Sequence, residues 1–395
     1  MNVVILNRFP LDKIKYHEWF DSSHTIFLFS KIQDEVHKSD YHYAKFYEDY
    51  DSSNLITQDI INLNKSIKID KIIALSEKDI LRAGNLRTFL HVPGMNKKTS
   101  WLFRDKVAMK NILFESNIPV TNFKEIDDIT DIITFFDKYG KSVVKPRREA
   151  GSRGVTIIES QEDLQALLNS NYFSPDDNNK WMIEKFVDGT LFHVDGLFGR
   201  GKVQNFFISE YLTSCLDLIN GKPLLTTTLQ ENDNNYWDIF SITERALRAL
   251  SNGFPCLFHA EVFISNQGKP FINEIACRIG GGKIYPAIKR KFGFDLMKQY
   301  IEFEMGKEPL KFSIKDKGYA GHAQLFIEKG IVSYVDQIPN KNWMLDCEIN
   351  FKLGETLHAK NKKDFSIIIE GDSKEQIDIR LNEALKWFYE SIEIK

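Results

Sequence analysis

The chain has 395 residues, of which 43% are hydrophobic and 27% charged, which is the composition of a folded globular protein with material for two or three domains. Its formal net charge of −3 provides no overall basic field for a nucleic-acid backbone, so we expect no nucleic-acid partner. Four scattered cysteines without a C-x-x-C pair predict neither a zinc site nor a disulfide framework, and the lack of a long apolar run predicts a cytoplasmic protein without a membrane anchor.

The first hundred residues carry two short apolar runs, at residues 3–6 and 71–75, that are typical of buried parallel strands. They predict a doubly wound α/β domain. Neither run is followed by G-x-G-x-x-G, so a dinucleotide is not the expected ligand. A helix is expected from about residue 104 to 116, because Asn117-Ile118-Pro119 would end it.

The remainder of the chain has an α+β pattern. Two β-hairpins are expected around residues 142–158 and 258–275. Near the end, a strand at 321–327 and an amphipathic helix at 373–392 predict a small C-terminal subdomain. The expected domains are 1–100, 101–308 with halves 101–190 and 191–308, and 309–395.

The second hairpin is expected to place two carboxylates face to face. If Gln267-Gly268 is a two-residue turn, Glu261 lies directly opposite Glu274. Like charges about 5 Å apart repel, so the pair needs a bound cation or a proton, and oxygen ligands favour magnesium over zinc. The alternative is a register shifted by one residue, which would leave the carboxylates on opposite faces as solvated charges.

Directly after this pair, the chain carries groups that suit an anion. Arg278 lies four residues beyond Glu274 and suits a phosphoryl group in transfer. Gly280 to Gly282 leave backbone N–H groups open to close approach by an anion.

The first hairpin contains Lys145 at the end of a strand, followed by a basic, glycine-containing loop over residues 147–154. Such a loop can fold over a polyphosphate. A plain hairpin with a solvated basic tip is the alternative interpretation.

Taken in order, these segments resemble the ATP-grasp superfamily, and within it the carboxylate–amine ligases of the L-amino-acid ligase type. The resemblance rests on Arg104-Asp105-Lys106, the Lys145 hairpin, Glu184-Lys185-Phe186-Val187 and the Glu261–Glu274 hairpin, and it covers roughly residues 85–300. It implies an ATP-grasp fold behind an N-terminal α/β domain, with ATP and Mg²⁺ as cofactors.

The resemblance also implies a role for each matching residue. Lys106 and Lys145 match the two phosphate lysines, and Glu149 to Gly154 match the loop that closes over the phosphates. The implied nucleotide contacts are Lys106, Lys145, Glu149, Ser152, Gly154, Glu184, Lys185, Val187 and His193, the implied magnesium ligands are Glu261 and Glu274, and the implied catalytic residues are Arg278 and Gly281. The family's asparagine two residues after the second glutamate is Ala276 here, so water or substrate would fill that position.

The implied reaction activates a carboxylate as an acyl phosphate, which an amine then attacks, releasing ADP and phosphate. Partners would be an amino acid or another small carboxylate and an amine acceptor, with a homodimer as one expected assembly. Thr226 to Thr228 would line the acceptor pocket, unless they only form a polar strand face. Two other functions remain open: a ligase that loads an amino acid onto a carrier protein or natural-product amine, and a non-catalytic ATP-binding regulatory protein.

Overall fold

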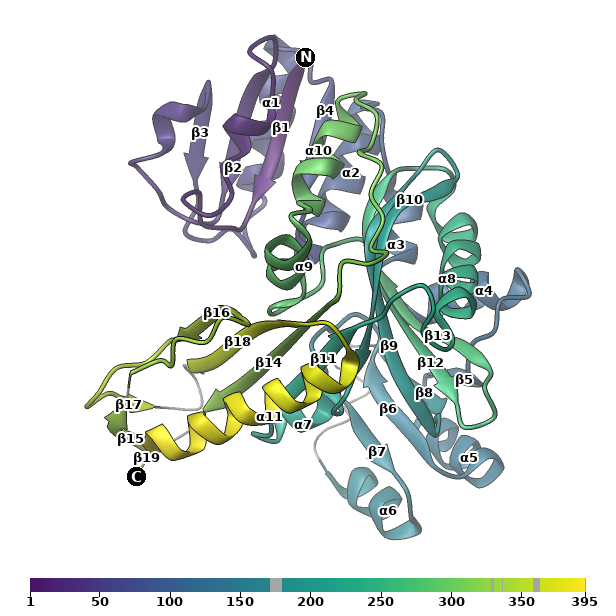
Figure 1. Ribbon diagram of the computed structural model, residues 1–395. Coiled ribbons are helices and arrows are strands. Elements are labelled where there is room, and N and C mark those ends of the chain that lie inside the picture. Colours follow the sequence, from purple (N-terminus) through teal and green to yellow (C-terminus); the bar gives the residue numbers. More distant parts are fainter. Residues whose placement is uncertain (171–179, 328–329, 336, 358–362, 395) are drawn as a thin grey trace.

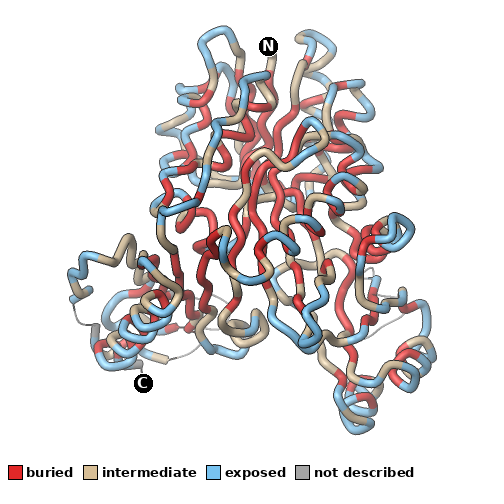
Figure 2. The backbone as a smooth tube through the Cα atoms, turned by 45° about the vertical axis from the view of Figure 1, so that its right-hand side comes forward, coloured by how far each residue is buried: buried red, intermediate tan, exposed pale blue. Residues whose placement is uncertain are grey.

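The computed structural model describes residues 1–170, 180–327, 330–335, 337–357 and 363–394. Its described strands form four sheets connected by helices, which confirms the predicted α/β and α+β class (Figure 1). Buried residues concentrate in the strands, and exposed residues lie on loops and on the outer faces of helices (Figure 2). Among the described helices, none has the length and apolar character needed to cross a membrane.

The N-terminal sheet has four parallel strands in the order β3-β2-β1-β4. These are β1 (Asn2–Asn7), β2 (Thr25–Ser30), β3 (Tyr43–Phe46) and β4 (Lys71–Ala74). Successive side chains of β1 alternate between two buried faces, which explains its continuous apolar run. Val4 and Leu6 pack with α1 (Leu55–Ser66) and α2 (Ile80–Leu90).

The opposite face of this sheet is covered by a distant part of the chain. Val3 and Ile5 pack with α9 (Ile284–Phe292), α10 (Leu296–Glu304) and the short 3₁₀ helix η1 (Tyr16–Trp19). The sheet is thus buried on both sides, as the doubly wound prediction requires, but residues beyond 280 supply most of its second layer (Figure 1).

Helix α4 (Lys106–Glu115) agrees with the predicted helix. The Asp105 carboxylate caps it by accepting the Ala108 N–H at 2.9 Å. Beyond its end, Asn117 has a left-handed φ of 56°, which turns the chain away before Pro119. The short helix α3 (Lys97–Leu102) precedes it.

A four-stranded antiparallel sheet forms the first half of the central domain, in the order β5-β8-β6-β7. Its strands are β5 (Phe123–Ile126), β6 (Ser142–Pro146), β7 (Thr156–Ile158) and β8 (Trp181–Lys185). Helices α5 (Ile129–Tyr139) and α6 (Gln161–Asn169) pack on it, and both begin at capping boxes. The predicted first hairpin is therefore confirmed.

The largest sheet is antiparallel and has the order β13-β12-β9-β10-β11-β14-β18-β16. Its strands are β9 (Gly189–Gly199), β10 (Lys202–Tyr211), β11 (Leu224–Thr228), β12 (Cys256–Ser265), β13 (Pro270–Ala276), β14 (Tyr319–Ile327), β16 (Met344–Ile349) and β18 (Lys363–Gly371). Helix α8 (Tyr236–Ser251) covers one face, and α9 and α10 pack on the other. These two helices therefore lie between the largest sheet and the N-terminal sheet.

Residues after the expected boundary at 309 continue the same sheet, because β14 pairs with β11. Helix α11 (Lys374–Ser391) packs on these C-terminal strands through Ile377, Leu381 and Leu385. A separate small sheet contains β15 (Gly330–Val335), β17 (Thr356–Leu357) and β19 (Ile392–Ile394), and a short helix, α7 (Cys215–Ile219), precedes β11.

Candidate active site

Glu261 on β12 pairs directly with Glu274 on β13, as predicted. The turn between the strands differs from the predicted one. The Ser265 N–H donates to the Lys269 carbonyl at 2.9 Å, so three residues form the turn, with Gly268 at a φ of +76°. The expected two-residue turn is therefore wrong: the third residue is accommodated by a left-handed glycine.

A β-bulge restores the predicted pairing of the carboxylates. Val262 pairs with Ile272, whereas Glu261 pairs with Glu274, so Asn273 is an extra residue on β13. This extra residue cancels the shift that the longer turn introduces. The alternative with carboxylates on opposite faces is therefore excluded.

Two lysines from other elements reach this pair. Lys106 Nζ, at the start of α4, lies 3.1 Å from Glu274 Oε2. Lys145 Nζ, on β6, donates to Asn273 Oδ1 at 3.2 Å, and Asn273 Nδ2 donates to Glu261 Oε2 at 2.7 Å. Burial opposes ionisation of Glu274, but Lys106 and Lys145 outweigh it and hold its pKa well below the ordinary value. The two facing carboxylates supply oxygen ligands that fit a magnesium ion, whose other ligands would be water and phosphate oxygens.

A third lysine, Lys110, is part of the same cluster and was not assigned a role from the sequence. Its side chain is fully buried, and its Nζ lies 3.0 Å from Glu184 Oε2. Lys145 binds the other oxygen of Glu184. Burial would raise the pKa of Glu184, but Lys110 and Lys145 outweigh it and lower the pKa to about 2. The spacing of four residues between Lys106 and Lys110, which puts both on one helix face, was the signal that could have found it.

The predicted hinge residues lie at the end of β8. The Lys185 N–H donates to the Asn122 carbonyl at 2.9 Å, and the Phe186 N–H donates to the Lys141 carbonyl at 3.0 Å. These two amide hydrogens are used within the protein, and Val187 follows them in the connection to β9. The Glu184 carboxylate faces the two lysines, so adenine contacts for this segment stay a prediction.

The predicted phosphate loop begins close to the lysine cluster. Lys106 Nζ donates to the Glu149 carbonyl at 2.6 Å. Arg153 Nη2 lies 3.4 Å from Glu149 Oε2 within the loop. Ser152 and Gly154 have positive φ angles of 54° and 71°, so the loop is a tight turn above Lys106.

Arg278 follows β13 and is held by a residue of the N-terminal domain. Its Nε donates to Glu77 Oε2 at 2.7 Å, and its Nη1 donates to the Ile279 carbonyl at 2.8 Å. Burial opposes its charge, but Glu77 and Glu274 outweigh it and raise the pKa of Arg278. No role was predicted for Glu77, because nothing in the N-terminal domain indicated a contact with residue 278.

The three glycines Gly280 to Gly282 differ in the space available to a side chain. A Cβ atom built on Gly280 would lie 2.5 Å from Asp195 Oδ1, and one on Gly282 would lie 2.4 Å from Gln324 Oε1. A Cβ on Gly281 would meet nothing within 4 Å. Gly281 therefore borders open space, which is the condition for the predicted contact between its amide and a substrate.

Comparison with known proteins matches residues 140–286 to the family model described as "ATP-grasp domain". Residues 140–286 form an ATP-grasp domain. It is 26% identical over 348 residues to the L-arginine-specific L-amino acid ligase of Bacillus subtilis, covering 82% of each protein. The predicted resemblance is thereby confirmed.

Solved structures show the same fold as this chain. The L-amino acid ligase from Bacillus licheniformis superposes with a TM-score of 0.75 at 15% identity, covering 100% of this chain and 98% of that one. The biotin carboxylase domain of the 2-oxoglutarate carboxylase of Hydrogenobacter thermophilus, solved with MgADP, has a TM-score of 0.71 at 15% identity and covers 100% and 90%. The predicted ATP-grasp fold is confirmed.

A buried hydrogen-bonded network lies next to the carboxylate pair on strands β9 and β12 of the largest sheet. His193 on β9 pairs in register with Glu261. The Nδ1 atoms of His193 and His259 lie 2.6 and 2.9 Å from the two oxygens of Asp195. Burial opposes the charge of His259, but Asp195 outweighs it and raises its pKa to about 9. His259 is therefore cationic at neutral pH, and the implied nucleotide contact of His193 stays a prediction.

His193, Asp195 and His259 also place three potential metal ligands within 4.8 Å of one another. An ionised Asp195 only accepts hydrogen bonds, so both histidine Nδ1 atoms carry their hydrogens toward it. In this arrangement the Asp195 carboxylate orients both imidazole rings through hydrogen bonds.

The three threonines of β11 lie beyond this network. Thr226 Oγ1 is 2.7 Å from His322 Nδ1, and Thr228 Oγ1 accepts the Ala320 N–H at 2.9 Å. Both hydroxyls are buried and used in bonds to β14, which agrees with a polar strand face, and a role in an acceptor pocket stays a prediction.

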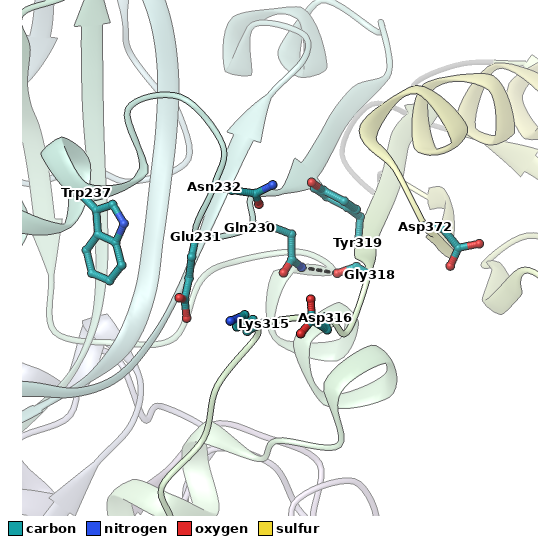
Figure 3. A pocket seen from close by; sticks show the side chains of 9 residues that line it. All are labelled: Gln230, Glu231, Asn232, Trp237, Lys315, Asp316, Gly318, Tyr319 and Asp372. Carbon is teal, nitrogen blue, oxygen red and sulfur yellow. Dashed lines mark hydrogen bonds between the residues drawn. The ribbon is translucent and has the colours of Figure 1, made fainter.

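A pocket of about 680 Å³ lies apart from the predicted residues, none of which lines it. It lies between the end of β11, the start of α8 and the segment leading into β14, where Gln230 donates to the Gly318 carbonyl (Figure 3). Its charged lining is Glu231, Asp316 and Asp372 against a single lysine, Lys315. An excess of carboxylates repels phosphates, so this pocket does not suit a nucleotide.

Proposed function

We propose that this protein is an ATP-dependent ligase that joins the carboxylate of an amino acid to an amine. The observation that carries the proposal is the convergence of Lys106 and Lys145 on the Glu261–Glu274 pair, with Arg278 close enough to influence Glu274. Phosphoryl transfer needs positioning and charge neutralisation from the protein, and this set supplies both. The L-arginine-specific relative supports an amino acid as the substrate.

In the first proposed step, a carboxylate oxygen of the substrate attacks the γ-phosphorus of ATP. The bond from that phosphorus to the bridging oxygen breaks, ADP leaves, and an acyl phosphate remains. Lys106 and Lys145 would neutralise the phosphates, and Arg278 would stabilise the group in transfer. Glu261 and Glu274 would hold Mg²⁺, which when bound neutralises further phosphate charge.

In the second step, the amine attacks the acyl carbon. A carbon–nitrogen bond forms, the bond from carbon to the phosphate oxygen breaks, and phosphate leaves while the amine loses a proton to solvent. The amide of Gly281, a residue that borders open space, would hold the substrate carboxylate in the first step and the carbonyl oxygen of the acyl phosphate in the second.

The test is to incubate the protein with ATP, Mg²⁺ and a pool of amino acids that includes arginine, and to measure ADP, phosphate and new amides by mass spectrometry. Hydroxylamine in a parallel reaction should trap an acyl hydroxamate. Hydroxamate without any amide would indicate a carrier-protein or natural-product acceptor. ATP binding without ADP release from any carboxylate would indicate a non-catalytic protein and contradict the proposal.

The proposal includes a cytoplasmic homodimer, following the sequence expectation. Sedimentation of the purified protein at micromolar concentration tests the assembly, because a monomer has half the mass of the expected species.

A further inference from the structure

Glu77 is the one N-terminal residue among those described above that contacts the predicted catalytic set. It begins the short helix η3 (Glu77–Asp79), after a two-residue connection from the end of β4. Its side chain is 14% exposed, and each carboxylate oxygen binds a different arginine: Oε1 binds Arg104 and Oε2 binds Arg278. A nearly buried carboxylate shared by two guanidinium groups fixes both of them, because charge-assisted hydrogen bonds are directional.

The contact with Arg278 constrains how its guanidinium points. The Glu77 carboxylate accepts a hydrogen bond from Nε, and the Ile279 carbonyl accepts one from Nη1. In the described part of the chain, the Nη2 group of Arg278 has no hydrogen-bond partner. The Nη2 group is therefore available to an anion, while Nε and Nη1 are held by the protein.

The contact with Arg104 extends the same anchor to the phosphate loop. Arg104 Nη2 donates to the Arg148 carbonyl at 2.8 Å, at the base of the loop that begins with Glu149. Within this group of three side chains, one carboxylate between two guanidinium groups leaves a net charge of +1. The assembly thus stays attractive to a phosphoryl group although both arginines are held.

We infer that Glu77 is a positioning residue for phosphoryl transfer: it orients Arg278 toward the transferring group and links it, through Arg104, to the base of the phosphate loop. This inference rests on the proposed ligase function. A misplacement of about 1 Å in such a group can lower a rate about 100-fold.

The chain offers a matched control. Lys71 Nζ on β4 lies 2.8 Å from Glu304 Oε2 on α10, so this ion pair also joins the N-terminal sheet to the ATP-grasp domain. It does not involve either arginine. Glu304→Gln therefore reports what the loss of an interdomain ion pair does by itself.

The experiment measures kcat, the KM for ATP, the KM for the amino acid and the thermal midpoint for wild type, Glu77→Gln, Glu77→Asp, Arg278→Lys, Glu304→Gln and the double variant Glu77→Gln/Arg278→Lys. We expect Glu77→Gln to lower kcat about 10- to 100-fold with the KM for ATP changed less than about threefold. Glu304→Gln should keep the wild-type kcat. The double variant should be slower than Arg278→Lys by much less than the factor that Glu77→Gln causes in wild type, because Glu77 acts mainly through Arg278.

Three results would overturn the inference: a wild-type kcat in Glu77→Gln, effects that multiply in the double variant, or a raised KM for the amino acid with unchanged kcat, which would make Glu77 a substrate contact. If Glu77→Gln does not fold, Glu77→Asp decides, because it keeps the charge and shortens the reach by one methylene. A wild-type protein that releases no ADP refutes the proposed function and this role with it, whereas an active wild type matched by the variants refutes only the inference about Glu77.

Discussion

Replacing Glu184 by glutamine should destabilise the protein rather than act only on nucleotide binding. Its carboxylate lies between Lys110 and Lys145, whose side chains are 0% and 8% exposed. Glu184→Gln keeps the shape of the side chain and removes the charge. Two buried ammonium groups then lose most of their compensation.

The size of the effect follows from this geometry. Removing one partner of a buried ion pair costs about 3–5 kcal/mol. The glutamine oxygen still accepts a hydrogen bond from one lysine, so we expect the lower end, about 3 kcal/mol. With an unfolding entropy of about 2.1 cal/mol/K per residue, that loss lowers the midpoint of whole-chain unfolding by about 4 °C.

The pH dependence has a definite sign. Glu184 has a pKa lowered to about 2 in the folded protein, mainly because the two lysines outweigh its burial. Its contribution to stability is therefore present above the ordinary carboxyl pKa and is lost as the pH falls toward 2. Glu184→Gln should flatten the decline in stability across this acid range.

Thermal melts between pH 2 and 7 provide the assay. Glu159→Gln is the matched control, because Glu159 pairs with Lys141 at 2.6 Å in the same lobe but is 57% exposed, so it should change the free energy of unfolding by less than about 1 kcal/mol. Adding Lys110→Met to Glu184→Gln should recover part of the lost stability, because a buried charge is removed with its partner. Equal melting points for Glu184→Gln and Glu159→Gln would refute the reasoning.

Three other predictions concern the active site. Glu274→Gln should abolish ADP release, because it removes a charge from the magnesium pair. It should also lower the thermal midpoint measured in EDTA, because Lys106 loses its partner. Full activity would contradict the site. Protease cleavage within Glu149–Gly154 should slow when ATP and Mg²⁺ are added, since phosphates would give the loop its contacts, and equal cleavage rates with and without nucleotide would count against a closing loop. Gly281→Val should fold normally and raise the KM for the carboxylate far more than the KM for ATP. Gly280→Val should lose stability, because a Cβ there meets Asp195. An unchanged carboxylate KM in Gly281→Val would remove Gly281 from the site.

The carboxylate pair was predicted from a two-residue turn, and the pairing is correct although the turn is not. The conformation of the chain between Glu261 and Glu274 was not predicted. The three-residue turn and the bulge at Asn273 each shift the register by one residue, and their effects cancel. A bulge depends on local packing against neighbouring strands, and a single hairpin sequence carries no clear signal for it.

Contacts within one element could be predicted, and contacts between distant elements could not. The Lys106 helix and its cap follow from neighbouring residues. The pairing of Glu77 with Arg278 joins positions about 200 residues apart, and no periodicity in one sequence indicates such a distance. The role of α9 and α10 as the second layer of the N-terminal sheet was not predicted either, because these helices are also distant from that sheet in the sequence.

That layer has a consequence for the newly made chain. Val3 and Ile5 are synthesised about 300 residues before Glu304, where the helix that covers them ends. At about 5–20 residues per second, the apolar face of the N-terminal sheet waits about 15–60 s for its cover. During synthesis this face is a target for chaperones, and chains shortened before α10 should collect in aggregates while chains that extend past residue 304 do not.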